Sequence, residues 1–284
     1  MWQALQRPSP LRPERSNVKL LHALARLCTG ITLLASAQAF ALPTPLATWN
    51  FNGTLAAAEA GAPALTAIDP LGANAFVTDM VFGVSQTVYQ FNGNALPANQ
   101  QAGLSVSTNG LLTAPNAYTV DMIFKFNVDN GSWKSILNAS DRTSDNAFYV
   151  SPGNKLQVYP VADGPSTFTF GDYHRISLTN NGAGHVTAYF DGIFQFDLLT
   201  TVMDFSTYGA ANPDHLLTFF ADNLFDGGQG EFVSGSVAQI RLYDGELSGG
   251  DVGELPNGSL PEPGTLLLVG LSLTALARAR RLRL

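Results

Sequence analysis

The chain has 284 residues but a single cysteine, Cys28, and few charged side chains, which make up 13% of the sequence. Lysine and arginine together number 15, against 22 aspartates and glutamates. Since binding to nucleic acid depends on basic side chains at the phosphates, this balance argues against a nucleic-acid partner. A single cysteine excludes an intramolecular disulfide, so an ordinary buried core must stabilise the fold.

The basic residues are also concentrated at the two ends of the chain. Residues 42–260 contain only 6 lysines and arginines against 20 acidic residues, a net charge of −14 compared with −7 for the whole chain. Such an acidic segment is suited to solubility outside the cell and to adsorption of divalent cations. Its 219 residues are enough for one large domain.

An uncharged apolar segment, residues 264–277, lies near the C-terminus. The tripeptide Pro261-Glu262-Pro263 precedes it, and four arginines follow: Arg278, Arg280, Arg281 and Arg283. As a helix it would be about 21 Å long, shorter than the bilayer core of about 30 Å, so we expect a transient anchor with its basic end in the cytoplasm. The alternative is a helix docked on the protein's own surface, where four arginines would be poor neighbours for a core.

This order of tripeptide, apolar segment and basic end resembles the PEP-CTERM sorting signal of Gram-negative bacteria. The resemblance implies that the membrane protease exosortase recognises Pro261, Glu262 and Pro263 and processes the tail. It also implies export across the inner membrane, anchoring there before processing, and then a place on the cell surface or outside the cell. Proteins of this family are associated with exopolysaccharide production and biofilm formation.

The N-terminus has the layout of a secretory signal peptide. A basic lead is followed by the mainly apolar residues 27–35 and then by small residues that offer a small-x-small cleavage site. We expect cleavage after Ala41, with Ala39 as the alternative. The basic lead consists of Arg7, Arg12, Arg15 and Lys19.

The region between the two ends is predicted to be an antiparallel β-sandwich. In residues 118–126, Tyr118 and every second residue after it are apolar, while Thr119, Asp121 and Lys125 fall on the other face. Segments 175–179 and 185–191 alternate in the same way, and the Asn/Gly-rich residues 180–184 between them are typical of a hairpin turn. A last strand is expected over 236–243, and no segment has clear helical periodicity.

The succession of strand motifs is similar to the laminin-G-like, concanavalin A-like jelly roll, which implies two stacked antiparallel sheets of about a dozen strands. The resemblance depends on the order and spacing of these segments, and residues 55–80 depart from it, so their pairing stays open. The motifs are Trp49–Gly53, Val88–Gly93, Tyr118–Phe126, Tyr173–Thr179, Thr187–Gly192 and Gly235–Asp244.

Catalytic motifs are scarce, and we expect no enzyme. The chain contains neither His-Glu-x-x-His nor Gly-x-Ser-x-Gly, and His174 is interpreted as a structural residue at a sheet edge. Glycosidases with a jelly-roll fold carry the motif Glu-x-Asp-x-x-Glu on one strand. The nearest acidic group here has the wrong spacing; its members are Asp244, Glu246, Asp251 and Glu254. A polysaccharide-active enzyme on a jelly-roll scaffold remains the alternative.

Two sets of residues are candidates for binding. Asp222, Asp226 and Glu231 place hard oxygen ligands on one Gly-rich loop, as Ca²⁺ requires, although a solvated acidic turn is the competing interpretation. The second set consists of aromatic residues that could stack on sugar rings or belong to the core: Trp133, Tyr149, Tyr159 and Tyr173.

The sequence therefore predicts an exported bacterial surface or matrix protein. Its β domain is expected to bind extracellular polysaccharide or another surface ligand without catalysis. The predicted parts are a signal peptide (1–41), the jelly-roll domain (42–255), a linker (256–260), and the sorting signal (261–284) with its membrane helix (263–277) and basic tail (278–284).

Overall fold

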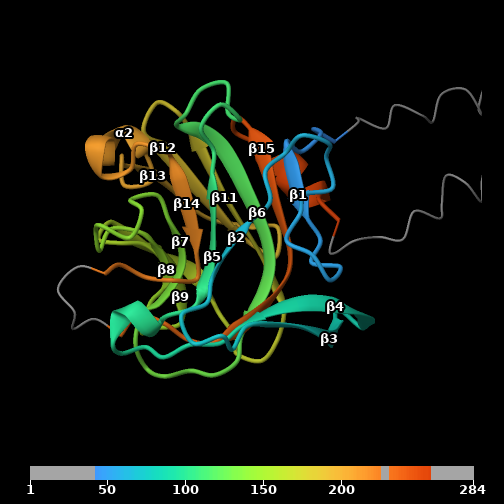
Figure 1. The fold of residues 1–284 in the computed structure, drawn as a ribbon. Coiled ribbons are helices and arrows are strands. Elements are labelled where there is room, and N and C mark those ends of the chain that lie inside the picture. The colour runs from blue at the N-terminus through green and yellow to red at the C-terminus, as the bar shows by residue number, and fades with distance from the viewer. Residues whose placement is uncertain (1–41, 225–229, 257–284) are drawn as a thin grey trace, which may run out of the picture. The chain divides into compact units, whose positions relative to one another are not determined.

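The computed structural model describes residues 42–224 and 230–256, and these form two antiparallel β-sheets packed face to face (Figure 1). The prediction of an antiparallel sandwich is thereby confirmed. Sheet A has eight strands in the order β13-β12-β11-β6-β15-β4-β3, with β1 also pairing β15. Their bounds are β1 Ala47–Trp49, β3 Ala75–Val81, β4 Val84–Phe91, β6 Ala117–Phe126, β11 His174–Asn181, β12 His185–Phe190, β13 Ile193–Leu199 and β15 Gly235–Asp244.

Sheet B has seven strands in the order β10-β9-β8-β7-β14-β5-β2. Their bounds are β2 Thr66–Ile68, β5 Gly103–Ser107, β7 Lys134–Asn138, β8 Phe148–Val150, β9 Lys155–Val158, β10 Ala162–Thr167 and β14 Leu216–Phe219. Helical segments among the described residues are short: η1 Ala98–Gln100, α2 Phe205–Tyr208, η2 Gly209–Ala211 and α3 Gly249–Glu254.

Strand β6 shows why the sequence pattern leads to a sandwich. The side chains of Tyr118, Val120, Met122, Phe124 and Phe126 are all fully buried in the core between the sheets, as their alternation predicts. Segments that departed from the laminin-G-like pattern also join the sheets: β2 pairs β5 in sheet B, and β3 forms a hairpin with β4 in sheet A.

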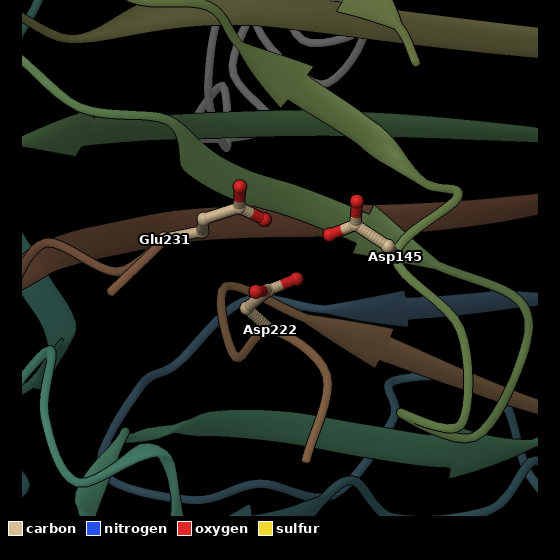
Figure 2. A group of neighbouring side chains, drawn as sticks. All are labelled: Asp145, Asp222 and Glu231. Carbon is tan, nitrogen blue, oxygen red and sulfur yellow. The ribbon is translucent and has the colours of Figure 1, made fainter. Parts of the chain in front are cut away.

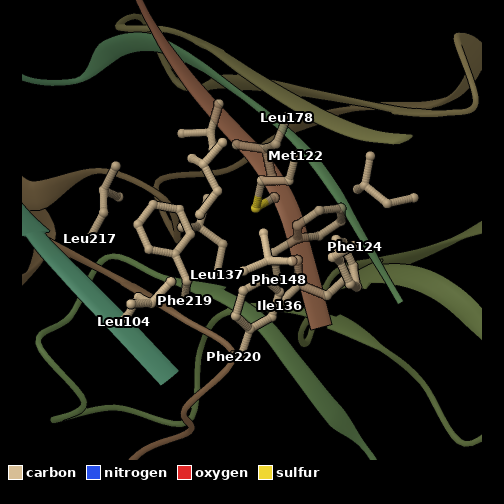
Figure 3. Packing of buried hydrophobic residues seen from close by; sticks show 14 of the residues in the cluster. Leu104, Met122, Phe124, Ile136, Leu137, Phe148, Leu178, Leu217, Phe219 and Phe220 are labelled. Atoms are coloured by element: carbon tan, nitrogen blue, oxygen red, sulfur yellow. The ribbon is translucent and has the colours of Figure 1, made fainter. Parts of the chain in front are cut away.

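Aromatic rings fill the centre of the core (Figure 3). Phe220 lies against Phe91 with ring centroids 4.3 Å apart and an angle of 5° between the planes, and it also contacts Phe124 at 5.1 Å. A fully buried aromatic side chain removes a large apolar area from water, so the packing of these rings stabilises the fold. An intramolecular disulfide cannot contribute, because the chain has a single cysteine.

We expect Gly103→Ala to lower the free energy of unfolding by about 1–3 kcal/mol, because the added methyl group overpacks the interior. A Cβ at Gly103 would lie 2.2 Å from the carbonyl oxygen of Phe219 on the neighbouring strand. Urea denaturation measures the change. Gly153→Ala is the control, since its Cβ would meet only Ser151 Oγ at 3.6 Å. Equal stability of both variants would contradict the close approach of β5 and β14.

Candidate functional site

Three aromatic side chains cluster on the outer side of sheet B. Phe148 and Val150 of β8 point into the core, so alternation turns Tyr149 to the opposite face. Trp133 comes just before β7 and Tyr159 just after β9. The Trp133 ring lies 5.6 Å from the Tyr149 ring and 5.2 Å from the Tyr159 ring, each at an angle of 73°. Tyr149 is buried, whereas Trp133 and Tyr159 keep part of their surface exposed.

Three carboxyl groups come together next to this aromatic cluster (Figure 2). Asp145 lies on the loop between β7 and β8, Asp222 follows β14, and Glu231 lies before β15. One carboxylate oxygen from each residue is within 4.8 Å of the other two. The loop after β7 turns back onto the segment after β14, because the backbone N–H of Leu224 donates to the carbonyl oxygen of Arg142 at 2.9 Å and Nε of Arg142 donates to the carbonyl oxygen of Asp222. We call these three residues the acidic cluster.

Tyr149 connects the aromatic cluster with the acidic cluster. Its hydroxyl oxygen lies 2.9 Å from Oδ1 of Asp222 and 2.7 Å from the carbonyl oxygen of Asp145. The side-chain amide of Asn223 donates to both carboxylates, at 3.2 Å to Asp145 Oδ1 and 3.2 Å to Asp222 Oδ2. The carboxyl groups are therefore held in a defined arrangement rather than on a loose turn.

Neighbouring segments fix the position of Asp222. Its backbone N–H donates to Oε1 of Gln101 at 2.8 Å, and its carbonyl oxygen accepts a hydrogen bond from Nε of Arg142. Arg142 also donates to the carbonyl oxygen of Ala98. A guanidinium group thus ties three segments together beside the acidic cluster.

Burial and mutual repulsion change the protonation of the cluster. Burial, followed by the charge of Asp222, raises the pKa of Glu231 to about 9. Burial also raises the pKa of Asp222. Glu231 therefore holds a proton at neutral pH, and a cation that bound all three carboxylates would have to displace it.

The raised pKa of Glu231 makes the free energy of unfolding depend on pH. Glu231 titrates near 4.5 without its folded environment and near 9 within it, so the folded state holds the proton more tightly. The stabilisation is complete below pH 4.5 and is lost as pH rises toward 9. We expect the free energy of unfolding without metal to fall over that interval, and Glu231→Gln to flatten the curve. Urea denaturation between these limits tests this, and parallel curves for the two proteins would contradict it.

Among the candidate binding residues that the structure describes, all but Tyr173 lie in the aromatic cluster or in the acidic cluster. Asp222 joins Glu231, and Trp133 joins Tyr149 and Tyr159. Tyr173 lies apart, in a small cluster on the other face of sheet A, where its hydroxyl donates to Asp79 at 3.0 Å and its ring contacts Lys125.

Several other candidates lie outside the described residues. They are Asp226, the cleavage residues Ala39 and Ala41, and the sorting motif Pro261, Glu262 and Pro263 with the arginines after it. Among the residues that are described, no helix is both long and apolar enough to cross a membrane.

Sequence reasoning missed Asp145, the half-exposed member of the acidic cluster. About 80 residues separate it from Asp222 and Glu231, and it reaches them because the loop after β7 turns back onto the segment after β14. The acidic residues at the end of the domain have structural roles instead. Asp244 accepts hydrogen bonds from Thr113, and Asp251 forms a capping box with Ser248 at the start of α3.

His174 also has a defined structural environment. Its Nδ1 lies 3.0 Å from Oδ2 of Asp191, and its Nε2 lies 2.7 Å from the hydroxyl of Thr169. The other oxygen of Asp191 accepts the backbone N–H of Arg175 at 2.8 Å. This chain of hydrogen bonds joins the start of β11 to the end of β12.

The sequence matches no protein-family model and no curated protein. The fold is similar to domain 4 of AbnA, a GH43 extracellular arabinanase from Geobacillus stearothermophilus, in complex with arabinotriose. The identity is 18%, the TM-score is 0.51, and the match covers 75% of this chain and 98% of that one. It is also similar to the binding domain of botulinum neurotoxin serotype D/C VPI 5993, with 11% identity, a TM-score of 0.50, and coverage of 74% and 50%. These similarities place the chain among β-sandwich domains.

Proposed function

We propose that the β-sandwich binds extracellular polysaccharide without cleaving it, and that the protein is exported to the bacterial surface or matrix. One observation carries the binding proposal: partly exposed aromatic rings lie next to converging carboxyl groups, and Tyr149 connects the two. Apolar ring faces with a few converging polar groups are typical of small-molecule binding sites.

Each part of the site matches one property of a sugar chain. The exposed surfaces of Trp133 and Tyr159 offer apolar faces to the C–H bonds of a sugar ring. Asp145, the partly exposed member of the acidic cluster, would accept a hydrogen bond from a sugar hydroxyl. Domain 4 of AbnA, which has a similar fold, is described in complex with arabinotriose, and this supports an oligosaccharide as the proposed ligand.

A divalent cation would strengthen this site. Ca²⁺ prefers six to eight oxygen ligands on adaptable segments, and the acidic cluster supplies three carboxyl groups from separate segments. Asp145, the half-exposed member, would face both the cation and the solvent side. Binding would displace the proton of Glu231, and Ca²⁺ affinity would therefore rise with pH.

Sedimentation with insoluble polysaccharide, with and without a chelator, tests the proposal on the full chain. We expect chelation and Asp145→Asn each to weaken retention by about tenfold or more, a loss comparable to that from disturbing a metal site. Asp141→Asn is the matched control, because Asp141 lies on the same loop but outside the acidic cluster. Retention that responds to neither change would contradict a role for the cluster.

One observation favours catalysis as a second candidate. Glu231 keeps its proton at neutral pH beside two other carboxyl groups, and a glycosidase requires such a pairing of an acid with a carboxylate. Release of reducing ends from a polysaccharide separates an enzyme from a binding domain.

The proposed route to the surface depends on the chain ends. Exosortase would recognise Pro261, Glu262 and Pro263, while the apolar segment holds the chain in the inner membrane until processing. Two prolines would favour an extended backbone around Glu262, a form that a protease can bind.

A further inference from the structure

A pocket lies on the outer side of sheet A, over the paired strands β1 and β15, and shares no residue with the site on sheet B. Figure 1 shows where these two strands lie in the fold. Its volume is about 350 Å³, in the range of small-ligand sites. One wall is apolar and is formed by residues from the first and the last segments of the β domain. That wall is made of Leu42, Pro43, Pro45, Leu255 and Pro256.

The floor of this pocket contains a buried hydrogen-bond acceptor without a partner. Gln239 on β15 is 5% exposed, and its Nε2 donates to Oδ1 of Asn50 at 2.6 Å. Its Oε1 is buried and has no hydrogen-bond partner within residues 42–224 and 230–256. Because a buried acceptor left unpaired costs free energy, a ligand hydroxyl that donates to Oε1 would be favoured.

The same floor carries a buried cation. Arg241 is 5% exposed and is the one charged residue among those that line the pocket. Its Nε and Nη2 bind Asp121 at 3.1 and 3.0 Å, and Nη2 donates to the carbonyl oxygen of Pro256 at 2.7 Å. A side-chain hydrogen bond also joins Arg241 to Tyr243, another residue that lines the pocket. The guanidinium is therefore held in place at the pocket, where its positive charge can attract a ligand carboxylate.

Neighbouring strands hold this arrangement rigidly. Asp121 on β6 also accepts the hydroxyl of Ser177 at 2.6 Å, and a second guanidinium, that of Arg175, lies 3.9 Å away. Arg175 in turn donates to the carbonyl oxygens of Val252 and Leu255 and thereby fixes the end of α3 and the wall residue Leu255 that follows it. Asp121 thus faces two cations, and Arg241 is not neutralised by a carboxylate of its own.

We propose that this pocket binds a hydroxylated carboxylate of the size of one hexuronic acid residue. The ligand carboxylate accepts hydrogen bonds from Arg241, a hydroxyl donates to Oε1 of Gln239, and the ring C–H groups lie against the prolines. The proposal goes beyond the sheet B site and shares no residue with it. A uronate-containing polymer would then have two separate contacts on one domain, and linked contacts raise the total affinity.

Calorimetric titration of the full chain with galacturonate and with galactose tests this. The two sugars differ in the carboxylate, so we expect galactose to bind about tenfold more weakly or not at all. Gln239→Glu replaces the acceptor with a nearly identical shape that repels a carboxylate, and it should weaken galacturonate binding by a similar factor. Gln90→Glu is the control, since Gln90 lies half-buried on β4 of the same sheet and does not line the pocket.

A second variant tests the same proposal in case Gln239→Glu does not fold. Pro43→Trp adds bulk at the exposed rim, leaves the Asp121 ion pair intact, and should also abolish galacturonate binding. Three results would each overturn the proposal: no detectable galacturonate binding, equal binding of galactose, or unchanged binding in a folded pocket variant.

Discussion

Trp133→Ala is expected to weaken binding of the full chain to its polysaccharide by about 30-fold. An aromatic anchor at the centre of a binding site contributes about 2 kcal/mol, and each 1.4 kcal/mol corresponds to a factor of about ten. Trp133 keeps part of its ring exposed while its edges pack against Tyr149 and Tyr159. Removing the ring would delete both the proposed sugar contact and the packing against Tyr149 and Tyr159. Affinity measured by depletion of the protein onto polysaccharide beads gives the change.

Two further variants separate stacking from simple loss of apolar surface. Trp133→Leu keeps apolar bulk without a flat ring, so it should bind almost as weakly as Trp133→Ala. Phe194→Ala removes an aromatic residue that is 55% exposed on sheet A, away from the site, and should bind like the unchanged protein. Affinity retained in Trp133→Leu would contradict the stacking role.

Deletion of residues 264–284 is expected to abolish membrane retention of the protein altogether. Under the sorting proposal, this deletion removes both the apolar segment that would lodge in the bilayer and the arginines that would hold its end in the cytoplasm. Glu262→Gln, which keeps the segment, should instead leave a heavier, uncleaved protein in the membrane fraction. Mass spectrometry of protein from membrane, surface and medium fractions of the producing cells measures both effects.

Glu254→Gln provides the control for charge loss near the tail, because Glu254 ends α3 inside the β domain. It should leave both the mass and the location unchanged. An identical mature mass in the deletion variant, in Glu262→Gln and in the unchanged protein would remove the sorting proposal.

The alternation of apolar and more polar residues was sufficient to predict the strands that have one apolar face. Alternation identified β6 and its core-facing residues from Tyr118 to Phe126, and turn residues located the hairpin between β11 and β12. The pattern could not show that Asp121, on the opposite face of β6, is also buried. That burial depends on Arg241 and Ser177, which come from the two neighbouring strands.

The site was predictable only where its residues are close in sequence. Asp222 and Glu231 stand near each other in a Gly-rich segment, whereas Asp145 reaches them because the loop after β7 turns back onto the segment after β14. Among the aromatic residues, composition could not separate Tyr149 from Tyr173. Their roles differ because the hydroxyl of Tyr149 bonds to the carboxylate of Asp222, whereas Tyr173 packs with Lys125 and Asp79.

Incubation of the full chain with polysaccharides from a bacterial extracellular matrix, followed by measurement of both bound sugar and new reducing ends, tests the binding role most directly. We predict that polysaccharide is retained intact, that retention falls in Trp133→Ala, and that no reducing ends appear over background. Release of oligosaccharides that stops in Glu231→Gln would contradict the account and make the acidic cluster a catalytic centre.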